Sequence, residues 1–271
     1  MSSSLVLSIV IYVYGFAFIF YTSSAIFSKK EITKVGTILS YIALSGNILG
    51  FALRWIESYD KGYGHIPLSN LYESLVFFAL VIAILYLYLE YRHKKYIISI
   101  ICSLFCLICM LYASFQTADA IRPLLPALKS NWLTIHVLTC FLGYSGFAVA
   151  FALSVLLIMK NALPEKIVKF TEAEIDDLTH QMVSFGFIFL TLGIITGAVW
   201  ANSAWGSYWT WDPKENWSLI TWFVYLAFLH LRFMKGWHGR RLAIVSIIGF
   251  LAVMFTYFGV NYLPGLHSYG N

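Results

Sequence analysis

Eight long apolar segments, separated by short polar loops, run through this chain of 271 residues. Most of them reach the ~20 residues that a helix needs to cross the hydrocarbon core of a bilayer. Only 11% of the residues are charged, against about 25% in an ordinary soluble domain, and the mean hydropathy is +0.76. Water is therefore not the main solvent of this chain, and the sequence predicts a polytopic membrane protein.

The apolar segments also decide the type of secondary structure. They are continuous, whereas the strands of a membrane barrel alternate between apolar and polar residues. Because backbone polar groups inside a bilayer must be satisfied internally, an all-α protein is expected. No internal repeat or low-complexity segment divides the chain, so we expect a single integral membrane domain over residues 1–271. The eight predicted spans cover residues 5–27, 35–53, 71–91, 96–115, 132–159, 182–201, 218–233 and 242–262.

Lysine and arginine are sorted between the two sides of this predicted topology. If the N-terminus lies outside, the inner segments hold 13 of the 18 basic residues and the outer segments hold five. Cytoplasmic loops carry an excess of Lys and Arg, so we expect both termini on the outer, extracytoplasmic side. The net charge of +5 is scattered between apolar segments and forms no dense patch, so no nucleic-acid partner is expected.

Residues 160–180 form the only strongly polar stretch of the sequence. Apolar side chains such as Ile175 and Leu178 are interleaved there with acidic ones such as Asp176 and Asp177. This pattern is typical of an amphipathic helix at a membrane surface. We therefore expect a helix that lies along the inner interface between the fifth and sixth spans.

The four cysteines all lie within apolar segments. Cys106 and Cys109 form a C-x-x-C pair, which in another setting would suggest thiol exchange or metal binding. No charged residue occurs between positions 97 and 115 to activate a thiol, so packing is the expected role of this pair.

A loop rich in tryptophan separates the sixth and seventh predicted spans, on the outer side. Its core reads WGSYWTWDPKENW over residues 205–217, with four tryptophans in thirteen positions. Aromatic anchoring at the membrane surface is one explanation, but this density exceeds what anchoring needs. We favour a flat binding face, on which a large planar ligand such as a porphyrin stacks while Asp212 and Lys214 meet its polar rim. Capping of the seventh span is the alternative role of Asp212.

Three histidines are candidate ligands for such a group, because imidazole is the most usual protein ligand of haem iron. His136, near the outer end of the fifth span, and His267, in the outer tail, fall on the side of the tryptophan-rich loop. His230 lies deeper in the seventh span, where an imidazole is costly unless it is paired or liganded. The alternatives are a helix-end hydrogen bond for His136, a flexible tail residue for His267 and an interhelical hydrogen bond for His230.

The tryptophan-rich loop resembles the "WWD" signature of haem-handling proteins, and its flanks resemble the CcsA (ResC) branch of cytochrome c biogenesis proteins. The matching flanks are PLSNLYES at 67–74, LGIITGAVWA at 192–201 and LPGLHSY at 263–269. The resemblance implies that His136 and His267 ligate haem iron at the outer face. It also implies that His230 receives haem within the membrane, with a second ligand from a partner subunit. Residues 202–217 would be the haem-binding loop. The resemblance implies that five of its residues bind haem: Trp205, Gly206, Trp209, Trp211 and Asp212. All of these except Gly206 would also position haem for catalysis.

The resemblance further implies a subunit of a cytochrome c synthase that acts with a CcsB-like (ResB-like) membrane protein. Haem b is then the transported ligand, and the thiols of an apocytochrome C-x-x-C-H motif add to its vinyl groups, kept reduced by thiol-reducing proteins. Membrane lipid is the remaining expected partner. Two alternatives stay open: a CcmC-like or CcmF-like protein that delivers haem to a chaperone, and a membrane electron carrier with resident haem b. The N-terminus shows no transit-like pattern, so a bacterial cytoplasmic membrane is expected before a plastid thylakoid.

Overall fold

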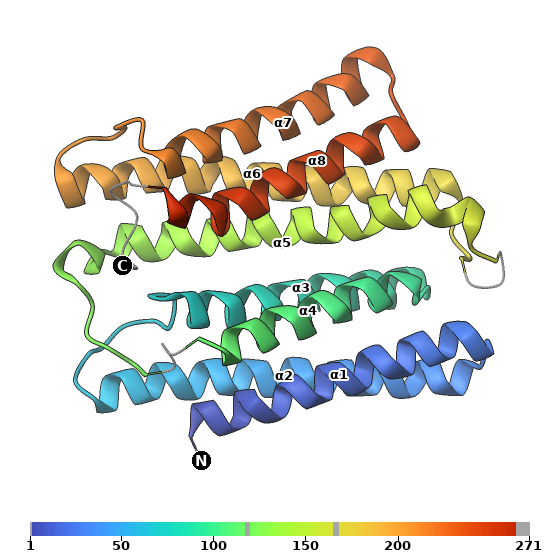
Figure 1. The fold of residues 1–271 in the computed structure, drawn as a ribbon, viewed down its shortest axis with the longest axis horizontal. Coiled ribbons are helices and arrows are strands. Elements are labelled where there is room, and N and C mark those ends of the chain that lie inside the picture. Colours follow the sequence, from blue (N-terminus) through green and yellow to red (C-terminus); the bar gives the residue numbers. More distant parts are fainter. Residues whose placement is uncertain (1, 117–119, 165–167, 264–271) are drawn as a thin grey trace. The chain divides into compact units, whose positions relative to one another are not determined.

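The computed structural model describes residues 2–116, 120–164 and 168–263 (Figure 1). Within these ranges the regular structure is helical, and eight helices are long and apolar enough to cross a membrane. This confirms the prediction of an all-α protein with about eight spans. The helices are α1 (Ser3–Phe27), α2 (Lys30–Asp60), α3 (Leu71–His93), α4 (Ile97–Ser114), α5 (Asn131–Met159), α6 (Glu172–Trp205), α7 (Pro213–Lys235) and α8 (Arg240–Tyr257).

The helices group into two compact units. Helices α1 to α4 form the first unit, and helices α5 to α8 form the second. In each unit, neighbouring helices in the sequence are joined by short connections and pack side by side (Figure 1).

Close packing of α1 against α2 organises the first unit. A Cβ atom on Gly46 would lie 2.7 Å from Val10, and one on Gly50 would lie 2.5 Å from Leu7. Only glycine leaves room for these apolar side chains at such a distance, so the two helices approach closely. Small residues at helix contacts are the usual means of association in a membrane, where lipid competes equally for apolar surface.

A buried ion pair corrects one predicted boundary. The outer loop was expected to begin at Arg54, but α2 continues to Asp60. The Arg54 Nε atom donates to Glu73 Oε1 at 2.8 Å, and both side chains are at most 3% exposed. The guanidinium also lies 4.8 Å from the centre of the Tyr72 ring. Asn70 caps α3 by accepting from the Glu73 backbone N–H at 2.9 Å. A charge that looked exposed is thus stabilised by a residue from the next helix.

A buried glutamate joins all four helices at the other end of the first unit. Glu90, on α3, is 3% exposed and accepts from the Tyr21 hydroxyl on α1 at 2.7 Å. Thr37 on α2 and Ser99 on α4 also donate their hydroxyl groups to its carboxyl oxygens. One acceptor therefore satisfies donors from three other helices, close to the basic turns that connect α1 with α2 and α3 with α4.

Glu90→Ala is expected to lower the free energy of unfolding by about 3 kcal/mol, because three hydroxyl donors, two of them fully buried, lose their acceptor. Thermal unfolding of the purified protein in one detergent measures the effect. Glu31→Ala is the matched control: the Glu31 side chain is 81% exposed and pairs with neighbouring Lys34, so little change is expected. Equal melting temperatures for the two variants would contradict the role given to Glu90.

In the second unit, α5 and α6 come close enough for their backbones to touch. A Cβ atom on Gly143 would lie 2.9 Å from the backbone nitrogen of Leu190. On another side of α5, the ring of Phe147 stacks on Tyr225 of α7 with a centroid distance of 3.5 Å and an interplanar angle of 4°. Both rings are fully buried. These contacts fix the register of α5 against α6 and α7, which matters for the site described below.

The prediction of a separate surface helix between the fifth and sixth spans is wrong. Residues 160–162 form a short 3-10 turn, and α6 runs without interruption from Glu172 to Trp205. The interleaved acidic residues belong to the first turns of this membrane-spanning helix.

An ionic network explains why acidic residues are tolerated there. Arg232, at the end of α7, donates to Asp176 at 2.5 Å and to Asp177 at 2.7 Å. Asp176 also accepts from the backbone N–H of Gly239 at 2.8 Å and lies 3.1 Å from His238 Nδ1. The acidic face of α6 therefore binds the connection between α7 and α8.

The four cysteines are buried and lie outside any disulfide, as expected for packing residues. The Cys106 thiol contacts the carbonyl oxygen of Ala79 at 3.4 Å. Cys106 therefore serves the contact between α3 and α4, and Cys109 is buried on α4.

Candidate functional site

The imidazole of His136 has a defined orientation in the second unit. Its helix, α5, begins at Asn131 after the side chain of Ser130 accepts from the Trp132 backbone N–H at 3.3 Å. One turn later, His136 Nδ1 lies 2.7 Å from the carbonyl oxygen of Gly193 on α6. A carbonyl can only accept, so Nδ1 carries the proton and the lone pair of the neutral ring is on Nε2. This is the tautomer that binds a metal through Nε2 while the second nitrogen is held by a backbone carbonyl.

Two glycines of α6 make the slot that holds this ring. A Cβ atom on Gly197 would lie 2.6 Å from His136 Nδ1, and one on Gly193 would lie 2.6 Å from the sulfur of Cys140. The pair is four residues apart, on one face of α6, and faces the corresponding face of α5. No other residue type fits at these positions without moving the imidazole or the thiol.

A row of aromatic rings connects His136 with the tryptophan-rich loop. The His136 ring is stacked on Trp200, with a centroid distance of 6.1 Å and an interplanar angle of 12°. Trp200 in turn meets Trp205 edge to face at 4.9 Å. Because Trp200 is only 2% exposed, its position is fixed by the helix packing. The row places His136 beside the start of the loop.

The sequence interpretation missed three residues of this arrangement. Gly193, Gly197 and Trp200 lie at i, i+4 and i+7 on α6 and therefore share one face of the helix. They stand inside the segment 192–201, which was noted for its family resemblance but not for its geometry. The spacing was the available signal, and the partner helix could not be known from it.

The backbone of the tryptophan-rich loop is held in two left-handed positions. Gly206 ends α6 with φ +77°, a conformation that suits glycine. Trp211 also has a positive φ, +57°, which costs a bulky residue roughly 1–2 kcal/mol. Its carbonyl oxygen accepts from the Asn216 side chain at 2.8 Å, which stabilises the turn. The backbone of the loop therefore has a defined conformation, held by these two positions and by the Asn216 hydrogen bond.

Asp212 begins α7, which agrees with the capping role considered for it. Its side chain accepts from the Lys214 backbone N–H at 2.8 Å, and Glu215 completes a reciprocal capping box. Glu215 also accepts from the backbone N–H of Thr210 at 2.7 Å. Both carboxyl side chains are buried: Asp212 is 6% exposed and Glu215 is 9% exposed. These bonds fix the second half of the loop on the end of α7.

The ring positions differ along the loop. Trp211 is 69% exposed and Tyr208 is 59% exposed, whereas Trp209 is half-buried and meets Trp211 edge to face at 5.9 Å. Trp217 belongs to α7 and packs on Phe255 of α8 at 4.1 Å. The loop thus anchors one tryptophan in the helix bundle and presents another to its surroundings.

The other two predicted ligands are placed differently. His267 lies outside the described residues. His230 is exposed on α7, among apolar side chains that are also exposed. The exposed apolar side chains of that face include Ile220, Phe223, Leu226 and Phe233.

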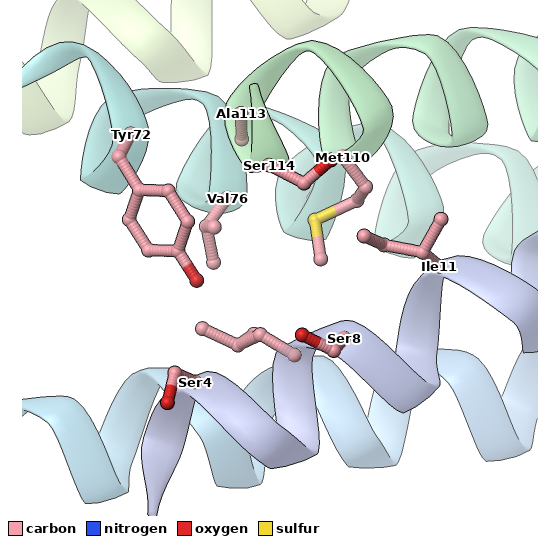
Figure 2. Close-up of a pocket in the computed structure, with 9 residues that line it drawn as sticks. Ser4, Ser8, Ile11, Tyr72, Val76, Met110, Ala113 and Ser114 are labelled. Atoms are coloured by element: carbon pink, nitrogen blue, oxygen red, sulfur yellow. The ribbon is translucent and has the colours of Figure 1, made fainter. Parts of the chain in front are cut away.

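No group of three or more His, Cys, Asp or Glu side chains that could hold a metal ion occurs within the described ranges. The first unit contains a cavity of about 80 Å³ between α1, α3 and α4. Figure 2 shows Tyr72 and Ser8 facing it from opposite sides, with Met110 above. Ligand pockets for planar organic groups usually measure about 300–1,000 Å³. This cavity is too small for such a group, and none of the predicted site residues lines it.

Fold and site together define a multi-pass helical membrane protein with an oriented histidine beside a structured aromatic loop. The family model described as cytochrome C assembly protein matches residues 68–267. Relatives named CcsA are 36–41% identical to this chain over 91–100% of its length, so the chain belongs to the CcsA family of cytochrome c biogenesis proteins.

Similar proteins come from algae and cyanobacteria. The cytochrome c biogenesis protein CcsA of Guillardia theta is 41% identical over 280 residues, which cover 92% of this chain and 90% of that protein. The CcsA protein of Prochlorococcus marinus strain MIT 9312 is 40% identical, covering 91% and 87%. The CcsA protein of Trieres chinensis is 36% identical, covering 100% and 96%.

A solved structure shares the fold. The cytochrome c heme lyase CcmF matches with a TM-score of 0.71 at 17% identity. The match covers 96% of this chain and 50% of that chain, so this protein spans half the length of the larger one.

Proposed function

We propose that this protein presents haem b to apocytochrome c at the outer face of its membrane, as the CcsA-type subunit of a cytochrome c synthase. The observation that carries the proposal is the orientation of His136. Its Nδ1–H is held by the Gly193 carbonyl, and its ring lies in an aromatic row that leads to the tryptophan-rich loop. Membership of the CcsA family supports the same role.

In this proposal, different site residues bind the iron of haem, contact its ring and hold the loop in position. Haem, as the substrate, offers an iron that takes imidazole nitrogen as an axial ligand and two vinyl groups that accept thiols. His136 Nε2 binds the iron from one side, and His267, outside the described residues, is the proposed ligand on the other. Trp209 and Trp211 contact the ring plane, and Asp212 keeps the loop in place through its capping bonds.

Attachment needs no oxidant and no activated nucleophile from this chain. Each cysteine S–H of the C-x-x-C-H motif adds across one vinyl double bond, so that an S–C bond forms and the hydrogen passes to the neighbouring carbon. Both thiols must be reduced, which is the task of thiol-reducing partners. The contribution of this protein is positioning, and the apocytochrome histidine replaces one of the two imidazole ligands as the product leaves.

His230 serves the earlier, transmembrane part of the route in this proposal. An imidazole on the exposed, apolar face of a spanning helix is costly unless another molecule covers it. A CcsB-like membrane subunit that packs on α7 would cover His230 and supply the second iron ligand. The distribution of Lys and Arg supports outer positions for both termini and for the loop.

Covalent haem attachment tests the proposal with a variant of the loop. The protein, a CcsB-like partner and a c-type cytochrome reporter are expressed in a bacterial host that lacks its own cytochrome c assembly proteins. Haem that stays on the denatured reporter measures attachment. Trp211→Ala is expected to lower the yield about tenfold, because an exposed ring that stacks on haem is lost.

Tyr208→Ala is the matched control. It removes a similarly exposed aromatic ring from the same loop, but one that has no assigned contact with haem. A yield that is equal in both variants would reduce the loop to an aromatic anchor. A protein that holds haem at a fixed stoichiometry and leaves the reporter unattached would favour the electron carrier instead.

A further inference from the structure

The connection between α7 and α8 carries a basic cluster that the proposed function does not use. We define the basic cluster as Lys235, Arg240 and Arg241, three exposed cations within seven positions. Of the residues that the structure describes, none forms an ion pair with any of the three. Three like charges so close together repel one another, and an anion bound between them would relieve this repulsion.

The acidic residues that contact this connection are already paired. Asp176 and Asp177 both bind Arg232. Two further acidic residues lie in the first turn of α6: Glu174 is bound in the capping box with Thr171, and Glu172 is exposed. The second oxygen of Asp176 accepts from the Gly239 backbone at 2.8 Å. The ionic network of Asp176, Asp177 and Arg232 thus forms without the basic cluster, whose three residues are exposed.

The same bonds hold the connection in a fixed shape. Gly236 ends α7 with φ +62°, and Gly239 precedes α8 with φ +64°. His238 and Gly239 are both fastened to Asp176. The basic cluster is therefore presented on an ordered turn, which lowers the entropy lost when a ligand is bound.

Apolar and aromatic side chains next to the cluster indicate the kind of anion. Phe233 and Met234, the last apolar residues of α7, are 68% and 70% exposed. The half-buried Trp237 has the Arg241 guanidinium 5.6 Å from its ring centre, as suits an aromatic residue at headgroup depth. A soluble anion would leave the apolar pair uncovered, whereas a phospholipid supplies an anionic headgroup to the cations and acyl chains to Phe233 and Met234.

We infer that the basic cluster, with Trp237, Phe233 and Met234, is a binding site for an anionic phospholipid. The occupant is a lipid of the surrounding bilayer with a net negative headgroup, seated at the ends of α7 and α8. The site is independent of the haem site proposed at His136 and the tryptophan-rich loop.

The test measures lipid retention by the intact purified protein. The protein is exchanged into mixed micelles that contain equal amounts of phosphatidylglycerol and phosphatidylcholine, and bound lipids are counted by native mass spectrometry. Phosphatidylglycerol is expected to be retained preferentially. The triple variant Lys235→Gln, Arg240→Gln, Arg241→Gln is expected to lose this preference on the order of 10- to 100-fold, from the usual contribution of each basic residue near an anionic surface.

A charge-matched variant separates a local site from the general charge of the protein. Lys29→Gln, Lys30→Gln, Arg92→Gln removes three exposed cations from the basic turns of the first unit and should keep the preference. Equal loss in both triple variants would overturn the inference. Should the first triple variant fail to fold, the single variant Arg240→Gln is expected to show a partial loss, and full retention there would overturn it as well.

A competition experiment distinguishes a lipid from a free anion. Millimolar inorganic phosphate should not displace phosphatidylglycerol, and Phe233→Ser, Met234→Ser should weaken lipid retention. Displacement by phosphate, with no effect of the Phe233 and Met234 changes, would identify a simple anion site and overturn the lipid assignment.

Discussion

Replacing His136 with alanine is expected to remove haem from the outer site of the purified protein. The imidazole is the proposed axial ligand, and losing a group that only orients a ligand typically costs 10–100-fold in metal affinity, so losing the ligand itself should cost more than about 100-fold. The visible absorption spectrum measures the effect: the six-coordinate haem spectrum should disappear. Added imidazole should restore part of it, because a small ligand can occupy the space that the side chain has left.

His180→Ala is the control for this experiment. His180 lies on α6, thirteen residues before Gly193, which is roughly 20 Å along the helix. It contacts Ser184 and the ring of Phe233, and it has no proposed contact with haem. The spectrum should therefore be unchanged. If His136→Ala also left the spectrum unchanged, iron ligation would have to be assigned to His230 or to a partner subunit.

The helices of this protein could be predicted because their cause is local. A continuous apolar segment in a bilayer has to be helical, and this holds for each of the eight spans whatever lies beside it. The capping of α3 by Asn70 and of α7 by Asp212 also follows from spacing within four residues. Local patterns were therefore sufficient for the number and type of elements.

The boundaries that failed depend on distant residues. Arg54 resembled the start of a loop, yet it is buried in α2 because Glu73 neutralises it. Asp176 resembled part of a surface helix, yet it lies in α6 because Arg232, 56 positions later, pairs with it. A charge within a membrane helix is acceptable when its partner is present, and a single segment does not show its partner.

The same limit applies to the candidate site. His136 could be proposed from its depth in the membrane and its resemblance to a family histidine, but its surroundings depend on the register of α5 against α6. That register is set by close backbone contacts such as Gly143 against Leu190. It brings Gly193, Gly197 and Trp200 to the ring, although more than 50 positions separate them from His136 in the chain.

Gly197→Ala should therefore weaken haem binding although every proposed ligand is still present. The added methyl group would lie 2.6 Å from His136 Nδ1 and 2.7 Å from its Cε1, distances that real contacts do not show. The ring must move away, and its hydrogen bond to the Gly193 carbonyl, now 2.7 Å, is lost or strained. Removal of such an orienting bond typically lowers metal affinity 10–100-fold, and we expect a loss in this range when haem is titrated into the haem-free protein.

Gly15→Ala tests whether this loss is specific. Gly15 is also a glycine within a spanning helix, but its nearest neighbour for a new Cβ is Leu107 at 3.7 Å, an ordinary contact. Alanine there should leave haem affinity unchanged and favour the helix slightly. The haem bound by Gly197→Ala should also show an altered spectrum, because the imidazole approaches the iron at another angle. Equal haem affinity and identical spectra in both variants would show that the slot between α5 and α6 serves helix packing alone, and His136 would then have to be oriented by the tryptophan side of the site.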